Sequence, residues 1–116
     1  MLKTATPILA SLNAEETIKF YTEKLGFTFI NNWDGYLIFS RDEIGIHLWP
    51  CYDPEIPKAT ACYIYVTEID KLYAEYKQHG IIHPNGKLEV KPWKMKQFSV
   101  LDNNGNLINF GEPVSA

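Results

Sequence analysis

The same order of elements is predicted twice along the chain, and this duplication limits the fold more than any other feature. In each half a short apolar run precedes a helical stretch that ends at a glycine, Gly26 in the first half and Gly80 in the second. Short apolar runs separated by turn-forming residues follow each glycine. The predicted fold class is therefore α+β, with two tandem βαβββ modules that form a cupped mixed sheet with the helices on its outer face.

The first module is predicted to cover about residues 1–53 and begins with a strand over 5–12. Asn13 then provides a helix N-cap, with Glu16 at the spacing of a reciprocal capping box. The apolar face of this helix comprises Ile18, Tyr21 or Phe20, and Leu25. Strands are expected over 27–30, 36–40 and 44–49, because residues 31–35 and 41–43 are typical of turns.

The second module is predicted over about 59–114, after a proline-bracketed linker at about 54–58 within one domain spanning 1–116. Its first strand covers 61–66, and the spacing of Thr67 to Asp70 indicates a helix start. The apolar face of that helix comprises Ile69, Leu72, Tyr73 and Tyr76. Strands over 97–101 and 106–111 flank the hairpin turn 102–105, whereas 83–92 is predicted as a loop and the strand near Ile81 is poorly defined.

Two curved modules side by side leave a concave face opposite the helices, and this face is the candidate binding site. Side chains alternate along a strand, so the residues sort between the two faces. Those expected to face the helices are Ile46, Leu48, Cys62, Ile64, Val66, Ile108 and Phe110. Those expected to face the cleft are Gly45, His47, Trp49, Ala61, Tyr63, Tyr65, Leu107, Asn109 and Gly111.

Composition excludes several classes of function. The 116 residues carry a formal charge of −3 without a basic run, which argues against nucleic acid or an anionic membrane as partner. No stretch approaches the roughly 18 apolar residues that cross a bilayer, and the N-terminus lacks the apolar core of a signal peptide, so we expect a cytoplasmic protein. Cys51 and Cys62 form no CxxC pair and are interpreted as reduced thiols. A domain this small also favours a homodimer.

Several fragments, in their order and spacing, carry a resemblance to a known family. They are Ala5-Thr-Pro-Ile-Leu9, Phe20-Tyr21, Leu25-Gly26-Phe27, Pro92-Trp93 and Asp102-Asn-Asn-Gly-Asn106. Together they resemble the vicinal-oxygen-chelate superfamily, which comprises glyoxalases, bleomycin-resistance proteins and extradiol dioxygenases. The resemblance covers nearly the whole chain and implies the same βαβββ duplication.

The resemblance also implies where metal-dependent members hold their ion. Those four positions correspond to Thr6, His47, Ala61 and Asn109 in this sequence. Only His47 is a good ligand, whereas a stable divalent site generally needs at least three from His, Asp, Glu or Cys. We therefore expect neither a metal nor another cofactor. Without an ion to polarise a carbonyl, the catalysis typical of the superfamily loses its main source, which argues against an enzyme.

Bleomycin-resistance proteins are the branch that this chain resembles most. Those proteins lack the metal ligands and sequester the drug in a groove at a dimer interface, and the resemblance implies the same for this chain. Pro7 matches the proline where the N-terminal strand is exchanged between subunits, and Trp93, followed by Phe98, matches a tryptophan of the groove. The family pattern of glycine and then Arg-Glu-Phe after that tryptophan is replaced by residues 94–98, Lys-Met-Lys-Gln-Phe. Lys94 and Lys96 are predicted to flank the groove and to repel a cationic drug.

The predicted function is non-catalytic binding and sequestration of a planar, partly cationic antibiotic, because aromatic walls stack on planar heterocycles. The predicted ligand-binding residues are Trp33, His47, Trp49, Tyr63, Tyr65, Trp93, Phe98 and Asn109. Two alternatives stay open. One is a divergent metal-dependent lyase or dioxygenase that recruits its ion through His47 with Glu43 or His83. The other is a dimeric domain whose own aromatic side chains fill the cleft, which leaves no open site.

Overall fold

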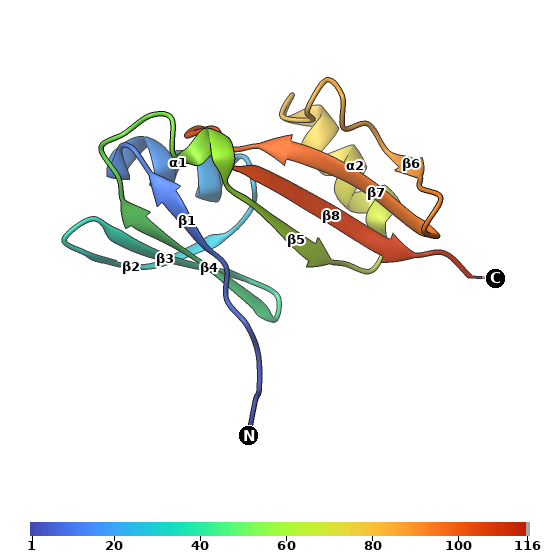
Figure 1. Cartoon of the computed structure of the whole chain (residues 1–116), viewed down its shortest axis with the longest axis horizontal. Coiled ribbons are helices and arrows are strands. Elements are labelled where there is room, and N and C mark those ends of the chain that lie inside the picture. The colour runs from blue at the N-terminus through green and yellow to red at the C-terminus, as the bar shows by residue number, and fades with distance from the viewer. Residues whose placement is uncertain (116) are drawn as a thin grey trace.

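The computed structural model describes residues 1–115 and shows two modules side by side (Figure 1). The βαβββ order is confirmed in both halves. The N-terminal module comprises β1 (Ile8–Ser11), α1 (Ala14–Glu23), β2 (Thr28–Trp33), β3 (Tyr36–Arg41) and β4 (Ile44–Pro50). The C-terminal module comprises β5 (Ala61–Tyr65), α2 (Ile69–Gln78), β6 (Glu89–Val90), β7 (Met95–Leu101) and β8 (Leu107–Pro113), after a short 3-10 helix, η1 (Pro57–Ala59).

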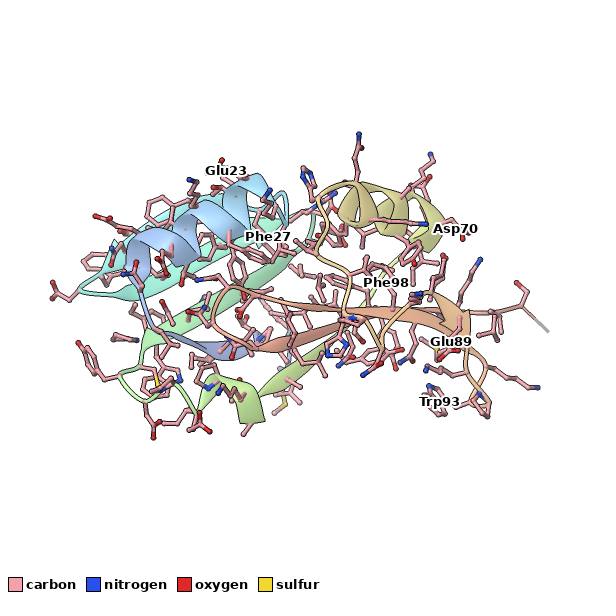
Figure 2. All side chains as sticks on the ribbon, turned by 90° about the horizontal axis from the view of Figure 1, so that it is seen from above. Glu23, Phe27, Asp70, Glu89, Trp93 and Phe98 are labelled. Atoms are coloured by element: carbon pink, nitrogen blue, oxygen red, sulfur yellow. The ribbon has the colours of Figure 1, made fainter. Side chains whose placement is uncertain are left out.

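Each module contains one four-stranded mixed sheet. The strand orders are β1-β4-β3-β2 and β5-β8-β7-β6, and in each sheet the first strand of the module runs parallel to the last while the other pairs are antiparallel. Both helices lie on the same side of the molecule, so the opposite faces of both sheets are open on the other side (Figure 2). None of the helices within residues 1–115 is long and apolar enough to cross a membrane.

Local signals correctly located α1. The side chain of Asn13 accepts a hydrogen bond from the backbone N–H of Glu16 at 2.9 Å, as an N-cap should. Gly26 follows the helix with φ of +75°, a conformation that favours glycine. A β-carbon at Gly26 would also lie 2.6 Å from Nη1 of Arg41, so the position needs glycine both for its backbone and for the space that Arg41 occupies.

The start of α2 differs from the sequence prediction. Thr67 does not cap the helix; the N-cap is Glu68, with φ of +55° and no capping bond from its own side chain. The carboxylate of Glu112 on β8 instead accepts the backbone N–H groups of Glu68 and Ile69 at 3.1 and 3.2 Å. A carboxylate at a helix N-terminus is favourable, but this one comes from 43 residues away and leaves no local signal.

Several strand boundaries were also predicted wrongly. Strand β6 (Glu89–Val90) lies within residues 83–92, which were predicted as a loop, whereas near Ile81 there is only an isolated bridge between Ile82 and Val100. Asn31 to Trp33 belong to β2, and only Asp34 and Gly35 form the turn, both with positive φ as a two-residue hairpin requires. A register shift between Phe29 and Asn31 lets the strand continue through the polar residues. The first strand is shorter than predicted: it begins at Ile8, and of residues 5–7 only Pro7 is bound to the sheet, through its carbonyl, which accepts the backbone N–H of His47 at 3.0 Å. The N-terminal end of the chain extends beyond the sheets (Figure 1).

One continuous core lies beneath both helices. Tyr21 stacks on Phe39 with ring centroids 4.9 Å apart, and Phe98 stacks on Phe110 at 5.1 Å, with Tyr76 against both of the latter rings. The predicted helix-facing residues are all part of this core or packed on it, which confirms the alternation. Aromatic pairs of this kind add roughly 0.5–1.5 kcal/mol each beyond the area that they bury.

A buried polar cluster joins the two modules at the β7–β8 turn. The carboxylate of Asp102, 6% exposed, accepts the hydroxyl of Tyr21 at 2.7 Å and the side-chain amide of Asn106 at 2.8 Å. The same amide donates to the backbone carbonyl of Ala10 at 2.8 Å. Burial, together with the neighbouring carboxylate, holds the pKa of Tyr21 well above its usual value, so the hydroxyl stays a donor. The turn therefore anchors β1 and α1 of the other module.

A second link joins the modules on the helix side. The guanidinium of Arg41 on β3 binds both carboxylate oxygens of Glu75 on α2, at 2.8 and 2.9 Å, and donates to the carbonyl of Leu25 at 2.7 Å. The hydroxyl of Tyr76 donates to the same carbonyl at 2.7 Å. Arg41 lowers the pKa of Glu75, so the pair remains ionised at neutral pH.

We expect Asp102→Ala to lower the free energy of unfolding by about 3 kcal/mol, because it leaves buried donors of Tyr21 and Asn106 without their acceptor. Urea denaturation of this variant beside Glu23→Ala measures the effect. Glu23 is an exposed acidic residue of α1, and its replacement should change the free energy by no more than about 0.5 kcal/mol. Equal effects in the two variants would contradict the role assigned to Asp102.

Candidate functional site

The open face of the C-terminal module carries a group of exposed aromatic side chains. Tyr63 and Tyr65 on β5 are 41% and 73% exposed, and their rings meet edge to face with centroids 5.4 Å apart. Trp93, 62% exposed, lies just before β7 and points to the side opposite α2 (Figure 2). These predicted site residues therefore share one solvent-facing surface.

Gln97 connects two of these aromatic residues. Its side-chain oxygen accepts the hydroxyl of Tyr63 at 3.0 Å and the indole N–H of Trp93 at 3.2 Å. Gln97 was not among the predicted site residues; the signal for it is its position on β7, where it alternates with the buried Phe98 and so shares the open face with Ser99. We refer to Tyr63, Tyr65, Trp93 and Gln97 as the aromatic platform. The rings of Tyr63 and Trp93 are held by these hydrogen bonds, so part of the side-chain freedom that binding would cost is already lost.

Gly111 makes room for this arrangement. A β-carbon at this position would lie 1.9 Å from the hydroxyl oxygen of Tyr63 and 2.6 Å from the ring carbon that carries it. The phenol of Tyr63 therefore lies directly over the backbone of β8, which explains why Gly111, predicted to face the cleft, is buried. Partial burial and the adjacent Tyr65 raise the pKa of Tyr63, so the phenol is uncharged at neutral pH.

Beside the platform, Asn109 is fixed by contacts within the module. Its side-chain oxygen accepts the hydroxyl of Ser99 at 2.6 Å, and its amide donates to the carbonyl of Cys62 at 3.1 Å. Burial, with a smaller effect of Asp102, raises the pKa of the Cys62 thiol to about 11. The thiol is thus protonated at neutral pH and unsuited to act as a nucleophile.

The N-terminal module contributes a second part of the open surface. His47 on β4 shares a 3.0 Å hydrogen bond through Nδ1 with the hydroxyl of Tyr36 on β3, and the two rings meet edge to face. Trp33 is paired with Tyr36 in the β2–β3 register, and Trp49 lies two residues beyond His47 on the same face of β4. The predicted residues His47, Trp49 and Trp33 are therefore grouped around Tyr36, on a different sheet from the platform.

Phe98 does not belong to the open surface, so this part of the predicted site is wrong. Its side chain is 1% exposed and lies between α2 and the sheet, against Tyr73, Tyr76 and Phe110 (Figure 2). The reason is the strand register: Phe98 pairs with Phe110, and both point toward the helices.

The predicted repulsion of a cation by Lys94 and Lys96 is also wrong in part. Lys96 is opposite Glu112 in the β7–β8 register, on the helix side, and its ammonium binds the carboxylate of Asp70 on α2 at 2.8 Å. Lys94 lies in the turn before β7, with φ of +62°. Lys96 therefore adds no positive charge to the open surface.

The residues at the superfamily's metal positions do not fit an ion. Thr6 is a weak donor and Ala61 has no donor atom, while Nδ1 of His47 and the amide of Asn109 are already hydrogen-bonded. Among residues 1–115 no group of three or more His, Cys, Asp or Glu is placed to hold a metal. Within the same residues His47, Glu43 and His83 are not brought together as such a group of three.

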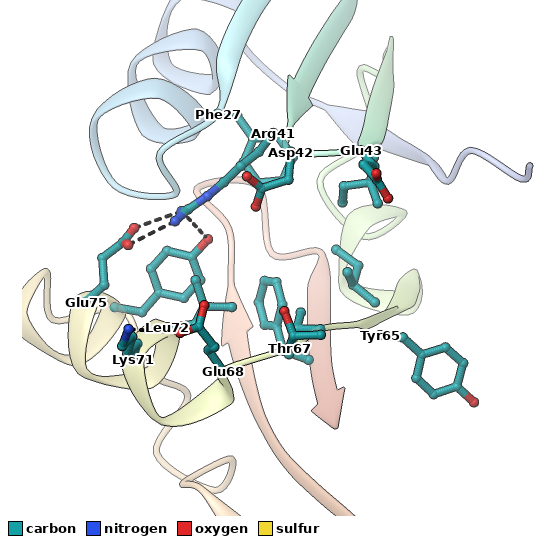
Figure 3. Close-up of a pocket in the computed structure, with 15 residues that line it drawn as sticks. Phe27, Arg41, Asp42, Glu43, Tyr65, Thr67, Glu68, Lys71, Leu72 and Glu75 are labelled. Atoms are coloured by element: carbon teal, nitrogen blue, oxygen red, sulfur yellow. Dashed lines mark hydrogen bonds and ion pairs between the residues drawn. The ribbon is translucent and has the colours of Figure 1, made fainter. Parts of the chain in front are cut away.

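Two hollows lie between the modules. One, of about 850 Å³, separates the β3–β4 turn from the start of α2 (Figure 3), and its basic side chains are bound to acidic neighbours, Arg41 to Glu75 and Lys71 to Glu68. The other, of about 420 Å³, lies between residues 5–7 and β5 and is lined in part by Tyr63 and Tyr65. The smaller hollow thus adjoins the aromatic platform.

The close packing of Tyr63 over Gly111 can be tested with a double-mutant cycle. We expect Gly111→Ala to reduce stability by about 1 kcal/mol in the native background, because the new methyl group displaces the phenol and breaks its bond to Gln97. In a Tyr63→Ala background the same substitution should cost less than about 0.5 kcal/mol. Urea denaturation measures all four proteins, and equal costs in the two backgrounds would contradict the packing.

Comparisons with known proteins agree with this architecture. The family model described as the Glyoxalase/Bleomycin resistance protein/Dioxygenase superfamily matches residues 7–110. Proteins named bleomycin resistance protein from Geobacillus stearothermophilus and Staphylococcus aureus are 33% identical, over 95% of this chain and 96% of theirs.

Solved structures show the same fold. A bleomycin resistance determinant encoded on the transposon Tn5 superposes with a TM-score of 0.85 at 23% identity, covering 98% of this chain and all of its own. A bleomycin-binding protein complexed with bleomycin gives 0.83 at 22% identity, covering 97% and 100%. The duplicated module and the match over most of the chain lead to one conclusion: this chain belongs to the glyoxalase/bleomycin resistance protein/dioxygenase superfamily.

Proposed function

We propose that this protein binds and sequesters an antibiotic with a planar ring system, of the bleomycin type, without altering it chemically. The observation that carries the proposal is the aromatic platform, in which Gln97 holds the exposed rings of Tyr63 and Trp93 on one open sheet face, with the ring of Tyr65 against Tyr63. Large flat side chains with fixed orientations are suited to stacking against planar heterocycles. The names of the 33% identical relatives support the same ligand class.

Sequestration rather than catalysis is favoured by the chemistry of the side chains. Two of the four positions that would hold an ion are threonine and alanine, while Nδ1 of His47 and the side-chain amide of Asn109 are hydrogen-bonded within the fold. The thiol of Cys62 has a raised pKa, so it offers no nucleophile at neutral pH. These faces provide aromatic area for stacking and a few polar groups, which are typical of ligand-binding sites.

We further propose that the groove is completed in a homodimer in which residues 1–7 are exchanged between subunits. Both open faces carry exposed apolar side chains that a second copy of the chain could bury, which supports a dimer. They are Ile8, Trp33 and Trp49 in one module and Tyr65 and Trp93 in the other. The N-terminal segment extends away from the fold, and its Met1 and Leu2 are fully exposed. Pro7 immediately before β1 lacks an N–H, which suits the point where a strand leaves its own sheet.

Titration of tryptophan fluorescence with metal-free and copper-loaded bleomycin tests the binding proposal. We expect saturable quenching in the native protein. In Trp93→Ala the affinity for the drug should fall at least about tenfold, because roughly 1.4 kcal/mol of stacking free energy is lost. Tyr52→Ala is the matched control, since Tyr52 is 93% exposed and outside the proposed groove. Absence of quenching in the native protein would remove bleomycin as the ligand.

Sedimentation equilibrium tests the dimer. We expect the native chain to sediment with twice the mass of one chain at micromolar concentration, and a variant without residues 1–5 to shift toward single chains with an unchanged circular dichroism spectrum. A native protein that stays a single chain would contradict the dimer, and a truncated protein that dimerises as well as the native one would contradict strand exchange.

A further inference from the structure

The charge of the platform's surroundings indicates which part of a ligand it recognises. Resting on the proposed function, we propose that the platform selects an uncharged planar ring system, and that Gln97 is the residue that sets this preference. Gln97 holds Tyr63 and Trp93 in position through an oxygen that carries no formal charge.

The three central strands of the C-terminal sheet present no formal charge on their open face. The alternating open-face positions of β5, β7 and β8 are Ala61, Tyr63, Tyr65, Met95, Gln97, Ser99, Leu101, Leu107, Asn109 and Gly111. The charged side chains of the same strands, Lys96 and Glu112, point to the helix side and bind groups of α2 there. On the edge strand, Glu89 is paired with Lys91, so that this pair carries no net charge.

The N-terminal module repeats this pattern. The open-face positions of β3 and β4 are Tyr36, Ile38, Ser40, Gly45, His47 and Trp49, and none is acidic or a lysine or arginine. The strand positions that would line a groove between the open faces of the two modules therefore carry no acidic residue, lysine or arginine, and Lys94, in the turn beside Trp93, lies outside these strands. Because desolvating an unpaired ligand charge against such a surface is costly, the charged parts of a ligand should remain in solvent.

Gln97 has one polar group left for a ligand. Its oxygen already accepts from Tyr63 and Trp93, which orients the amide so that its NH₂ group is free of both rings. A ligand with a carbonyl oxygen or a ring nitrogen at the edge of its plane can accept that hydrogen bond while it stacks. A glutamate at the same position would hold both rings equally well but would add a negative charge and remove the donor.

The test follows the indole N–H signal of Trp93 by nuclear magnetic resonance, assigned with Trp93→Phe. The probes are uncharged 2,4′-bithiazole and copper-loaded bleomycin, each titrated at about 50 mM and about 500 mM NaCl, conditions in which the screening length differs about threefold. The proteins are the native chain, Gln97→Glu and Gln97→Met. The glutamate variant keeps the acceptor and adds charge, whereas the methionine variant keeps the size and removes the acceptor.

We expect both probes to shift the Trp93 signal of the native chain with affinities that change less than about twofold between the two salt concentrations. Gln97→Glu should bind bleomycin at least about fivefold more tightly at low salt, with the gain lost at high salt. Gln97→Met should shift the free Trp93 signal and weaken both probes, because the ring is no longer held.

Each other outcome is decisive. Bleomycin binding that falls about tenfold or more with salt in the native chain, or bleomycin binding without bithiazole binding, would overturn the inference and leave sequestration standing. Bithiazole binding without bleomycin binding would support the inference and reject the drug. Failure of both probes to bind would reject the proposed function and the inference with it.

Discussion

The carboxylate of Asp102 is the interaction on which the rest of the structure depends. It lies in a turn of one module and orders the hydroxyl of Tyr21 in the helix of the other, while Asn106, bound to the same carboxylate, reaches the backbone of β1. Within residues 1–115 no buried side-chain nitrogen or oxygen is left without a partner, so the cost of burying this charge is compensated. Because the modules are fixed in this way, both helices pack on one core and the open faces of both sheets lie on the same side of the molecule.

Sequence patterns predicted most of the fold because the signals involved are local. Asn13, Gly26 and Gly80 mark helix ends by their own backbone or side-chain chemistry, and alternation sorted the strand residues. The start of α2 could not be predicted in this way, since its capping carboxylate, Glu112, is distant in sequence. The buried polar cluster at residues 102–106 could be predicted only as a hairpin turn, because its hydrogen-bond partners are in the other module.

The sheet face of each candidate residue was predicted correctly where strand alternation was applied and wrongly where it was not. Tyr63, Tyr65 and Asn109 lie on the open face that their strand positions indicate. Phe98 and Lys96 were placed beside the groove by their proximity to Trp93, although the even-numbered positions of β7 all point to the helices. Alternation would have placed Gln97 on the open face, but its two hydrogen bonds, to Tyr63 and Trp93, form only in the folded chain.

The alternation along β5, β7 and β8 has an evolutionary consequence. Odd-numbered residues of these strands face outward and even-numbered residues pack inward, so two sets of positions are interleaved along one stretch of chain. Substitutions in the outward set can change what the surface recognises while the inward set keeps folding intact, and a lineage can exchange one ligand for another by point mutation alone. Gly111 is the exception among the outward residues, since any side chain there collides with Tyr63. Gly111 is thus the outward position of these strands at which we expect the least sequence change.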